Sequence, residues 1–358
     1  MSKLKKILIM AGGTGGHVFP GLAVAHAFRE KGIEVEWLGT EKGLEAQWVP
    51  KSGIPIHFIS IGGLRGKGWK TKLLMPWKLG AAIFQALGII RRLNPDVVLG
   101  FGGFASGPGG LAAWILRKKL IIHEQNAKPG LTNRCLSRLA SKVLEGFPNT
   151  FKQREKVVTV GNPIRKEIVA IGGASRGRDE ARCSLLVLGG SLGAEAINRL
   201  LPRALAKLPE ASRPMVYHQT GEKHFNDTVN AYKSAGVSAE VVPFIVEIDK
   251  AYAAADIVLC RAGALTVSEL CAAGVGAILV PFPYAADDHQ TANAEFMAKN
   301  GAAVLIQQSA LTEERLAALL EEVSGSTEKR AAMAKAAYEL RAINATEKVT
   351  EICEEICH

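Results

Sequence analysis

Short runs of consecutive apolar residues recur along the chain, and several of them end in a glycine-rich turn. Lys6–Met10 leads into Gly12–Gly16 and a helical stretch from about Phe19 to Glu30. Ser184–Leu188 leads in the same way into Gly189–Ala194 and a helical stretch to about Leu208. Strand, glycine-rich turn and helix is the opening unit of a doubly wound α/β domain. Its recurrence about 177 residues later predicts two such domains in tandem.

Further apolar runs follow each of these opening units. They lie near residues 33–38, 56–59, 96–100, 119–123 and 142–146, and near 214–219, 239–243, 257–261, 277–281 and 302–306. Because the runs are continuous rather than alternating, we predict Rossmann-like parallel sheets covered on both faces by helices. A turn at 160–163 marks the junction. We expect a first domain at 1–162, a second at 163–340, and a closing helix at 341–358 that packs back toward the first.

Length and composition agree with two folded domains. The 358 residues are 48% hydrophobic, which excludes a disordered chain. The six cysteines form no C-x-x-C motif, which argues against a zinc site or a disulfide framework and favours a reducing compartment. Residues 97–116 are uncharged and long enough to cross a bilayer, but they contain six glycines and Pro108. We therefore expect strand, loop and helix there, in a soluble protein.

The net charge of +10 is unevenly distributed. Residues 1–160 hold 24 Lys and Arg against 9 Asp and Glu, whereas residues 161–358 carry a net charge of −5. The segment 46–95 has no acidic residue and mixes basic with bulky apolar side chains. This pattern favours an anionic membrane surface over nucleic acid, although an ordinary helix with its apolar face in the core is the alternative. The expected membrane face comprises Lys70, Lys72, Leu73, Trp77, Lys78 and Phe84.

Two glycine-rich loops of the first half each follow a strand. Backbone N–H groups of such loops, together with a helix N-terminus, can hold a diphosphate, and tight packing of turns is the alternative. The candidate residues are Gly13, Gly102, Gly103 and Ser106. His17 stands at the helix start, where it either acts as a general base or merely caps the helix. The G-x-G-x-x-G spacing of dinucleotide sites is not met, which argues against a nicotinamide cofactor.

The second half offers another anion-accepting loop. Arg261–Leu270 follows a strand, and Glu269 lies about one turn into the helix, where its carboxylate can accept both hydroxyls of a ribose. The polar segment 281–290 then leaves the next strand. A phosphate loop, a ribose acceptor and a polar loop in succession indicate a nucleotide sugar. No D-x-D pair is found where a sugar-nucleotide metal would bind, so we predict neither a metal site nor a cofactor.

Five strings, in this order along nearly the whole chain, resemble the bacterial N-acetylglucosaminyltransferases of glycosyltransferase family 28. They are Gly12–His17, His123–Asn126, Gly161–Arg165, Gly189–Ala194 and Ala264–Glu269. The resemblance implies the GT-B arrangement, in which two Rossmann-like domains face a cleft. It implies an inverting transfer from UDP-N-acetylglucosamine to the muramoyl 4-hydroxyl of undecaprenyl-diphospho-muramoylpentapeptide in peptidoglycan synthesis.

The resemblance also implies roles for individual residues. Ile245 would meet the uracil, Glu269 the ribose and Gln290 the sugar, and His17 would be the general base. The expected donor-binding residues are Thr14, Gly15, Gly16, Asn126, Arg165, Ser191, Ile245, Ala264, Leu265, Thr266, Glu269 and Gln290. Many relatives carry Tyr where this chain has Phe104, so no polar role is expected at that position.

The resemblance places the protein on the cytoplasmic face of the inner membrane, with cell-wall or division proteins as further partners. Three alternatives stay open at this point. A UDP-sugar epimerase would need no lipid acceptor, and a transferase with another lipid, such as diacylglycerol, would share the donor loops. A nucleotide-binding membrane adaptor without catalysis would not require His17.

Overall fold

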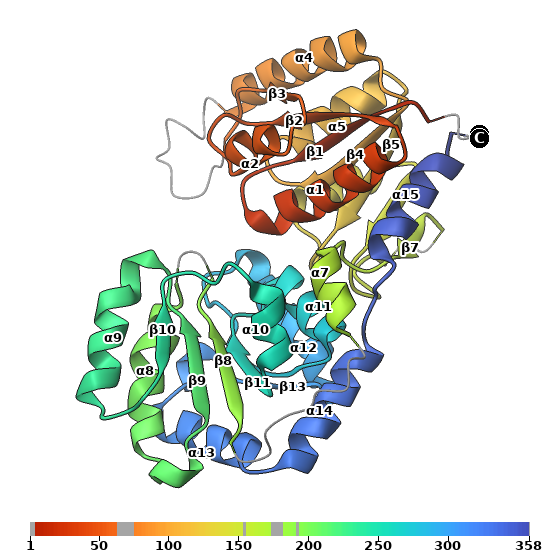
Figure 1. The fold of residues 1–358 in the computed structure, drawn as a ribbon. Helices are drawn as coiled ribbons and strands as arrows, with labels where there is room; N and C mark the ends of the chain where they lie inside the picture. Colours follow the sequence, from red (N-terminus) through yellow and green to blue (C-terminus); the bar gives the residue numbers. More distant parts are fainter. Residues whose placement is uncertain (1–3, 63–74, 153–154, 173–181, 191–192, 358) are drawn as a thin grey trace. The chain divides into compact units, whose positions relative to one another are not determined.

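The protein divides into two compact units. The computed structural model describes residues 4–62, 75–152, 155–172, 182–190 and 193–357. One unit comprises Met1–Ile164 with Ile343–His358, and the other comprises Arg165–Ala342. Each unit contains its own parallel sheet, so the predicted pair of doubly wound α/β domains is confirmed (Figure 1).

The sheet of the first unit has seven parallel strands in the order β3-β2-β1-β4-β5-β6-β7. The strands grow outward from β1 on one side and from β4 on the other, which makes the β1/β4 boundary the switch point where ligands of such sheets bind. The strands are β1 Lys6–Ala11, β2 Glu34–Gly39, β3 Ile56–Phe58, β4 Val97–Gly102, β5 Lys119–Glu124, β6 Lys142–Glu145 and β7 Val157–Thr159.

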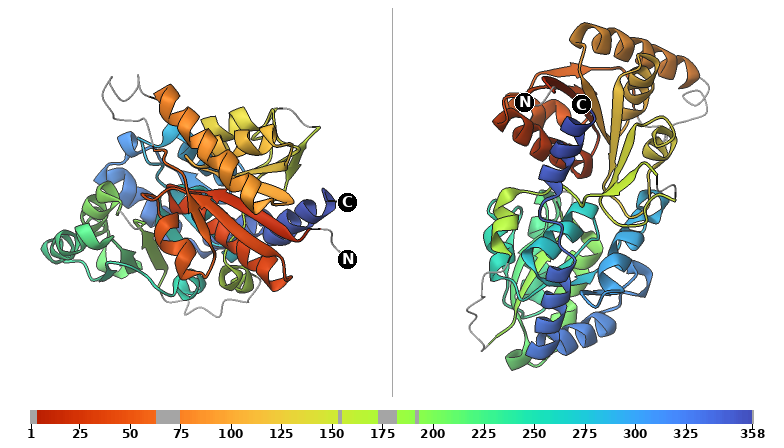
Figure 2. Two further views of the ribbon diagram at one scale, coloured as in Figure 1. Left: turned by 90° about the horizontal axis from the view of Figure 1, so that it is seen from above. Right: turned by 90° about the vertical axis from the view of Figure 1, so that its right-hand side faces the viewer.

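Helices cover both faces of this sheet. On one face, α1 and α15 share a core with β1, and Figure 2 shows the blue C-terminal helix beside the red α1. On the other face, α4, α5 and α6 form a second core. The described helices of the unit are α1 Gly15–Glu30, α2 Glu45–Lys51, α4 Met75–Leu93, α5 Ser106–Ile115, α6 Leu131–Leu136 and α15 Ala345–Glu355.

Two details of the first unit differ from expectation. Helix α1 begins at Gly15 instead of near Phe19, because the glycines that suggested a loop already adopt helical backbone. Strand β7 was not expected, since three partly exposed residues give only a weak apolar signal. The uncharged segment 97–116 forms β4, a turn and α5, as expected.

The second unit repeats the plan with six parallel strands in the order β10-β9-β8-β11-β12-β13, so its switch point lies between β8 and β11. The strands are β8 Ser184–Leu188, β9 Met215–Gln219, β10 Glu240–Val242, β11 Ile257–Cys260, β12 Gly276–Leu279 and β13 Ala303–Leu305.

Helices α8, α9, α13 and α14 contribute to one core of the second unit, while α7 packs against α10 and α11. The helices are α7 Lys166–Ile171, α8 Glu195–Ala206, α9 Phe225–Ser234, α10 Ile248–Ala254, α11 Ala264–Ala273, α12 His289–Ala298, α13 Glu313–Ser324 and α14 Thr327–Glu339. Four short 3-10 helices cover Glu210–Ser212, Glu222–His224, Ala286–Asp288 and Gln308–Ala310. Across the described parts of both units, no helix combines the length and hydropathy that a membrane span requires.

Candidate functional site

Two glycine loops meet at the switch point of the first unit. The loop after β1 and the loop after β4 approach so closely that a Cβ on Gly103 would lie 2.1 Å from the carbonyl oxygen of Gly12. Gly103 also has a φ of +83°, and Gly102 and Gly13 have φ of +101° and +92°, a region that side-chain-bearing residues rarely adopt. Glycine at these positions therefore lets two loops from neighbouring strands share one place on the sheet edge.

A buried carboxylate, which the sequence did not reveal, holds the first of these loops. Glu45 is fully buried, and its Oε2 accepts a hydrogen bond from the backbone N–H of Gly13 at 2.9 Å. Its Oε1 accepts from the backbone N–H and the hydroxyl of Thr40, at 2.9 and 2.8 Å. Because Glu45 stands in another helix 32 residues away, no local motif marks it. The only local sign is the absence of side chains at Gly39 and Gly43, whose Cβ atoms would collide with it.

The four residues predicted to hold an acceptor diphosphate lie at this meeting of loops, but they are not equivalent. Gly13 and Gly103 are half-buried and Gly102 is buried, and none of the three has a side chain that could contact a ligand. Ser106 is fully buried, and its hydroxyl reaches the carbonyl oxygens of Met10 at 3.0 Å and Gly102 at 2.7 Å. Its side chain thus fixes the second loop to β1, and an anion at this place would meet backbone N–H groups.

His17 lies in the first turn of α1 beside these loops, half-buried. Its Nδ1 is 2.9 Å from Oε1 of Gln125, which follows β5. The amide nitrogen of Gln125 is in turn 3.0 Å from Nδ1 of His123, and Nε2 of His123 is 2.9 Å from the carbonyl oxygen of Gly161. Burial lowers the pKa of His123 to about 4, so this ring is neutral near pH 7. The three side chains come from α1, from β5 and from the loop after β5, and they form one connected chain of hydrogen bonds.

The loops after β5 and β6 are held by two further buried carboxylates. Glu124 accepts hydrogen bonds from the backbone N–H and the side-chain amide of Asn126, at 3.0 and 3.1 Å. Glu145 accepts from the hydroxyl of Thr159 at 2.7 Å and from the backbone N–H of Phe151 at 3.1 Å. Asn126, a predicted donor contact, is therefore held in place by Glu124 at the same sheet edge as His17.

In the second unit, the start of α11 is a candidate anion site. Ala264, Leu265 and Thr266 form its first turn, and no side chain caps the helix at Gly263. The N–H groups of a helix's first turn have no partner within the helix, and its dipole adds positive potential. These three predicted residues therefore lie together at the carboxyl end of β11. Ser191, predicted to join them, lies outside the described residues.

Glu269 is the charged centre of this second site. Its Oε1 is 2.9 Å from Nη2 of Arg165, and its Oε2 accepts a hydrogen bond from the hydroxyl of Tyr252 at 3.2 Å. Burial raises the pKa of Glu269, and the ion pair with Arg165 opposes that shift. The structure thus joins Arg165 and Glu269, both predicted donor residues, and adds Tyr252, which sequence reasoning missed because it lies on another helix.

Two further predicted donor residues lie near the same sheet edge, Ile245 in the loop after β10 and Gln290 in the first turn of α12. Ile245 is buried, and its backbone N–H donates to Oε1 of Gln219 at 3.2 Å. Its neighbours Phe244 and Val246, which the sequence did not single out, are exposed. Gln290 accepts a hydrogen bond from the backbone N–H of Phe282 at 2.9 Å, so its Oε1 fixes the loop after β12.

The predicted membrane face is only partly described. Trp77 and Phe84 on α4 are 80% and 78% exposed, and Lys78 between them is also exposed. A core helix would bury these aromatic side chains, so the core alternative does not apply to the two of them. Lys70, Lys72 and Leu73 lie outside the described residues.

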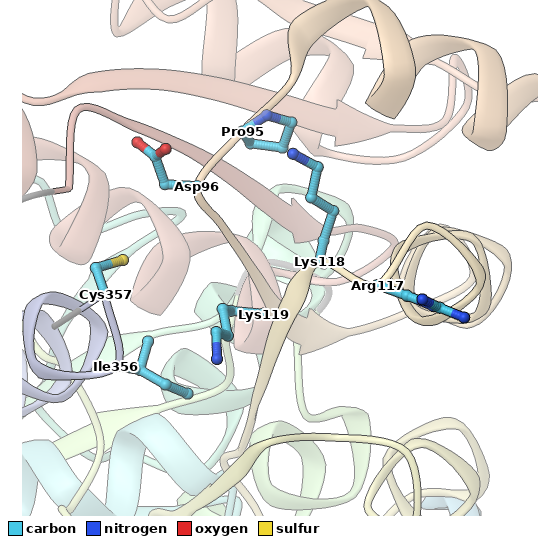
Figure 3. Close-up of a pocket in the computed structure, with 7 residues that line it drawn as sticks. All are labelled: Pro95, Asp96, Arg117, Lys118, Lys119, Ile356 and Cys357. Carbon is cyan, nitrogen blue, oxygen red and sulfur yellow. The ribbon is translucent and has the colours of Figure 1, made fainter.

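An open pocket of about 500 Å³ lies elsewhere on the first unit (Figure 3). Its lining includes Asp96, Lys118 and Lys119 at the amino ends of β4 and β5, together with Cys357. The predicted site residues gather at the opposite, carboxyl ends of the strands, so this pocket is not the candidate site. Among the described side chains, no group of three or more His, Cys, Asp or Glu could hold a metal ion.

Comparison with known proteins agrees with both halves of this description. Residues 7–145 match the glycosyltransferase family 28 N-terminal domain, and residues 184–356 match its C-terminal domain. The chain is 53% identical over 354 residues, 98% of each chain, to the UDP-N-acetylglucosamine–N-acetylmuramyl-(pentapeptide) pyrophosphoryl-undecaprenol N-acetylglucosamine transferase of Nitrosococcus oceani. It is 52% identical to the transferase of the same name from Azotobacter vinelandii, again over 98% of each chain. The crystal structure of Acinetobacter baumannii MurG superposes with a TM-score of 0.85 at 40% identity, covering 98% of this chain and 99% of that one.

Proposed function

The chain belongs to glycosyltransferase family 28, and on that premise we propose that it transfers N-acetylglucosamine from UDP-N-acetylglucosamine to a lipid-linked muramoyl-pentapeptide. The acceptor group is the muramoyl 4-hydroxyl of undecaprenyl-diphospho-muramoylpentapeptide, and the product serves peptidoglycan synthesis. One observation carries the proposal: more than half of the residues are identical, over almost the full length, to relatives named for this transfer.

The reaction is a single displacement with inversion at the anomeric carbon. The acceptor hydroxyl forms the new C–O bond, the bond from the anomeric carbon to the diphosphate breaks, and UDP leaves with the electron pair. The hydroxyl proton must go to a base, and we assign that role to His17. General-base assistance contributes about 10²–10⁴-fold to such a step. Imidazole is well suited to accept a proton at physiological pH, because its unperturbed pKa lies close to that pH.

The second unit holds the donor in this proposal. The first turn of α11 and Ser191 would bind the diphosphate, where N–H groups and the helix dipole stabilise the charge that develops on departing UDP. The carboxylate of Glu269 would accept hydrogen bonds from the ribose hydroxyls, and Arg165 opposes the rise in its pKa that burial causes. The proposed donor contacts of the second unit are Arg165, Ser191, Ile245, Ala264, Leu265, Thr266, Glu269 and Gln290.

The first unit receives the lipid-linked acceptor in this proposal. The two glycine loops, through Gly13, Gly102 and Gly103, would bind its diphosphate, with Ser106 holding the second loop in position. Helix α4 would rest on the cytoplasmic face of the inner membrane through Trp77, Lys78 and Phe84, with Lys70 and Lys72 adding positive charge.

An assay of donors against acceptors tests the proposal directly. UDP should be released from UDP-N-acetylglucosamine only when a muramoyl-diphospholipid is present, and the product should carry a β-linked N-acetylglucosamine. Epimerisation of the donor without any acceptor would contradict the transferase. Turnover with a diacylglycerol acceptor in place of the muramoyl lipid would instead support the second candidate, a transferase that uses another lipid.

A further inference from the structure

The hydrogen-bond chain at His17 ends on backbone carbonyl oxygens, and this fixes its direction. Carbonyl oxygens can only accept, so each one determines where the neighbouring side chain carries a hydrogen. This hydrogen-bond chain links the side chains of His17, Gln125 and His123, and it lies entirely within the first unit.

The direction is set first at His123. Its Nε2 lies 2.9 Å from the carbonyl oxygen of Gly161, so the hydrogen of the ring is on Nε2. The ring is fully buried, which disfavours its charged form and lowers its pKa to about 4. Because a neutral imidazole carries one hydrogen only, Nδ1 of His123 is an acceptor.

The amide of Gln125 can then be oriented in one way only. Its nitrogen lies 3.0 Å from Nδ1 of His123 and 3.1 Å from the carbonyl oxygen of His123, both of which accept. The two amide hydrogens match these two acceptors, and turning the amide around would place its oxygen against a carbonyl oxygen. Asn133 donates to the same carbonyl at 3.0 Å, which confirms that this oxygen accepts. The amide oxygen Oε1 therefore faces His17.

We propose that Gln125 and His123 are positioning residues that hold neutral His17 in the tautomer with its hydrogen on Nδ1 and its lone pair on Nε2. The contact between Nδ1 of His17 and Oε1 of Gln125 measures 2.9 Å, and an amide oxygen can only accept. No described residue hydrogen-bonds Nε2, which leaves that nitrogen available to a substrate. Gly102 also lies against this ring, where a Cβ would come within 3.1 Å of Cε1 and 3.2 Å of Nδ1.

The consequence for catalysis rests on the proposed function, whereas the tautomer itself does not. When the acceptor hydroxyl attacks, its proton passes to Nε2, and the imidazolium keeps donating from Nδ1 to Gln125. A ring with its hydrogen on Nε2 would present no lone pair to the hydroxyl. In serine proteases, a partner that selects the wrong tautomer lowers kcat by about 10⁴-fold, which is an upper limit for the effect here.

Nitrogen NMR of the full chain labelled at histidine tests the tautomer without any turnover. The resonances of His17 are assigned by their loss in His17→Gln, and protonated and unprotonated ring nitrogens are resolved by their chemical shifts. We expect an unprotonated Nε2 in the wild type. Gln125→Leu should lose this preference. A wild-type ring with its hydrogen on Nε2, or no difference between Gln125→Leu and wild type, would overturn the proposal.

Kinetics with matched variants test the consequence. Gln125→Leu should lower kcat between about tenfold and 10⁴-fold. Asn198→Leu is the control, because it removes the buried amide of a comparable histidine pair in the second unit. It should leave kcat per folded molecule unchanged, with the folded fraction measured by circular dichroism. An equal loss of kcat in Gln125→Leu and Asn198→Leu would contradict a positioning role. Failure of the base assignment is distinguishable, since it would appear as full turnover in His17→Ala.

Discussion

The two units each bury a histidine at the penultimate position of a parallel strand and pair it with a side-chain amide. In the first unit, His123 on β5 pairs with Gln125. In the second, His218 on β9 has Nε2 3.0 Å from Oδ1 of Asn198 and Nδ1 2.9 Å from the hydroxyl of Tyr232. Burial lowers the pKa of both rings, to about 4 for His123 and about 3 for His218.

The pairs differ in what the chain of hydrogen bonds reaches next. In the second unit it ends on Tyr232, which is itself buried, so every donor and acceptor is used inside the core. In the first unit it continues to His17, a half-buried ring at the sheet edge with a nitrogen left over. The same imidazole–amide pair therefore stabilises the core in one unit and orients a candidate base in the other. The difference between the units therefore lies in the last residue of each hydrogen-bond chain, which is His17 at a sheet edge in one unit and Tyr232 in the core of the other.

Removing each histidine should give the largest contrast between the units. His17→Ala should lower kcat by about 10²–10⁴-fold and leave the KM for the donor nearly unchanged, because the ring acts on the acceptor hydroxyl. His218→Ala should leave kcat per folded molecule intact and lower the free energy of unfolding, because it strands the buried groups of Asn198 and Tyr232. Steady-state kinetics and urea unfolding measure the two effects. Equal kcat in both variants would remove the distinction.

Acidification should weaken both units through these buried rings. Above pH 6.5 His123 and His218 are neutral in both the folded and the unfolded chain, so they add no pH dependence. Below it the unfolded chain binds protons that the folded chain does not, and the free energy of unfolding falls by roughly 1.4 kcal/mol per pH unit for each ring. The fall should continue to about pH 4 for His123 and about pH 3 for His218.

Urea unfolding of His218→Gln between pH 6.5 and 4 measures this term for the second unit. Because glutamine does not titrate, the free energy of unfolding of the variant should fall less steeply with decreasing pH than that of the wild type, by about 1.4 kcal/mol per pH unit. This difference in slope does not depend on the stability of the variant at neutral pH. A slope equal to that of the wild type would show that His218 is not held neutral.

The smallest expected effect concerns membrane binding, which we expect of the surface of α4 in the first unit and not of α14 in the second. Lys78→Ala on α4 should weaken binding to vesicles that contain anionic lipid by about fivefold, because each cation near such a surface contributes roughly 1 kcal/mol. Lys335→Ala, which removes an exposed cation from α14 of the second unit, is the matched control and should have no effect. Vesicle sedimentation measures both. Equal weakening by the two variants would contradict a membrane face on α4.

Much of the fold was predictable because it depends on local pattern. Continuous apolar runs predicted almost every strand, and glycine turns predicted the opening unit of each domain, since each signal lies within a few consecutive residues. The start of α1 was misplaced, because Gly15 and Gly16 are equally compatible with a loop and a helix until neighbouring loops constrain them. Strand β7 was missed, because a short edge strand buries too little apolar surface to show a pattern.

The sequence by itself determined the two-domain parallel architecture, the uneven charge and the presence of His17 at a helix start, all of which follow from residue type and spacing. Only the tertiary structure decided what orients His17. Gln125 is 108 residues away, and Glu45 is 32 residues from the loop that it holds. Parallel strands place their carboxyl ends at one edge whatever their separation along the chain, so residues without any common motif become hydrogen-bond partners. Direction along such a chain is set by backbone carbonyl oxygens, which every residue possesses and no sequence pattern reveals.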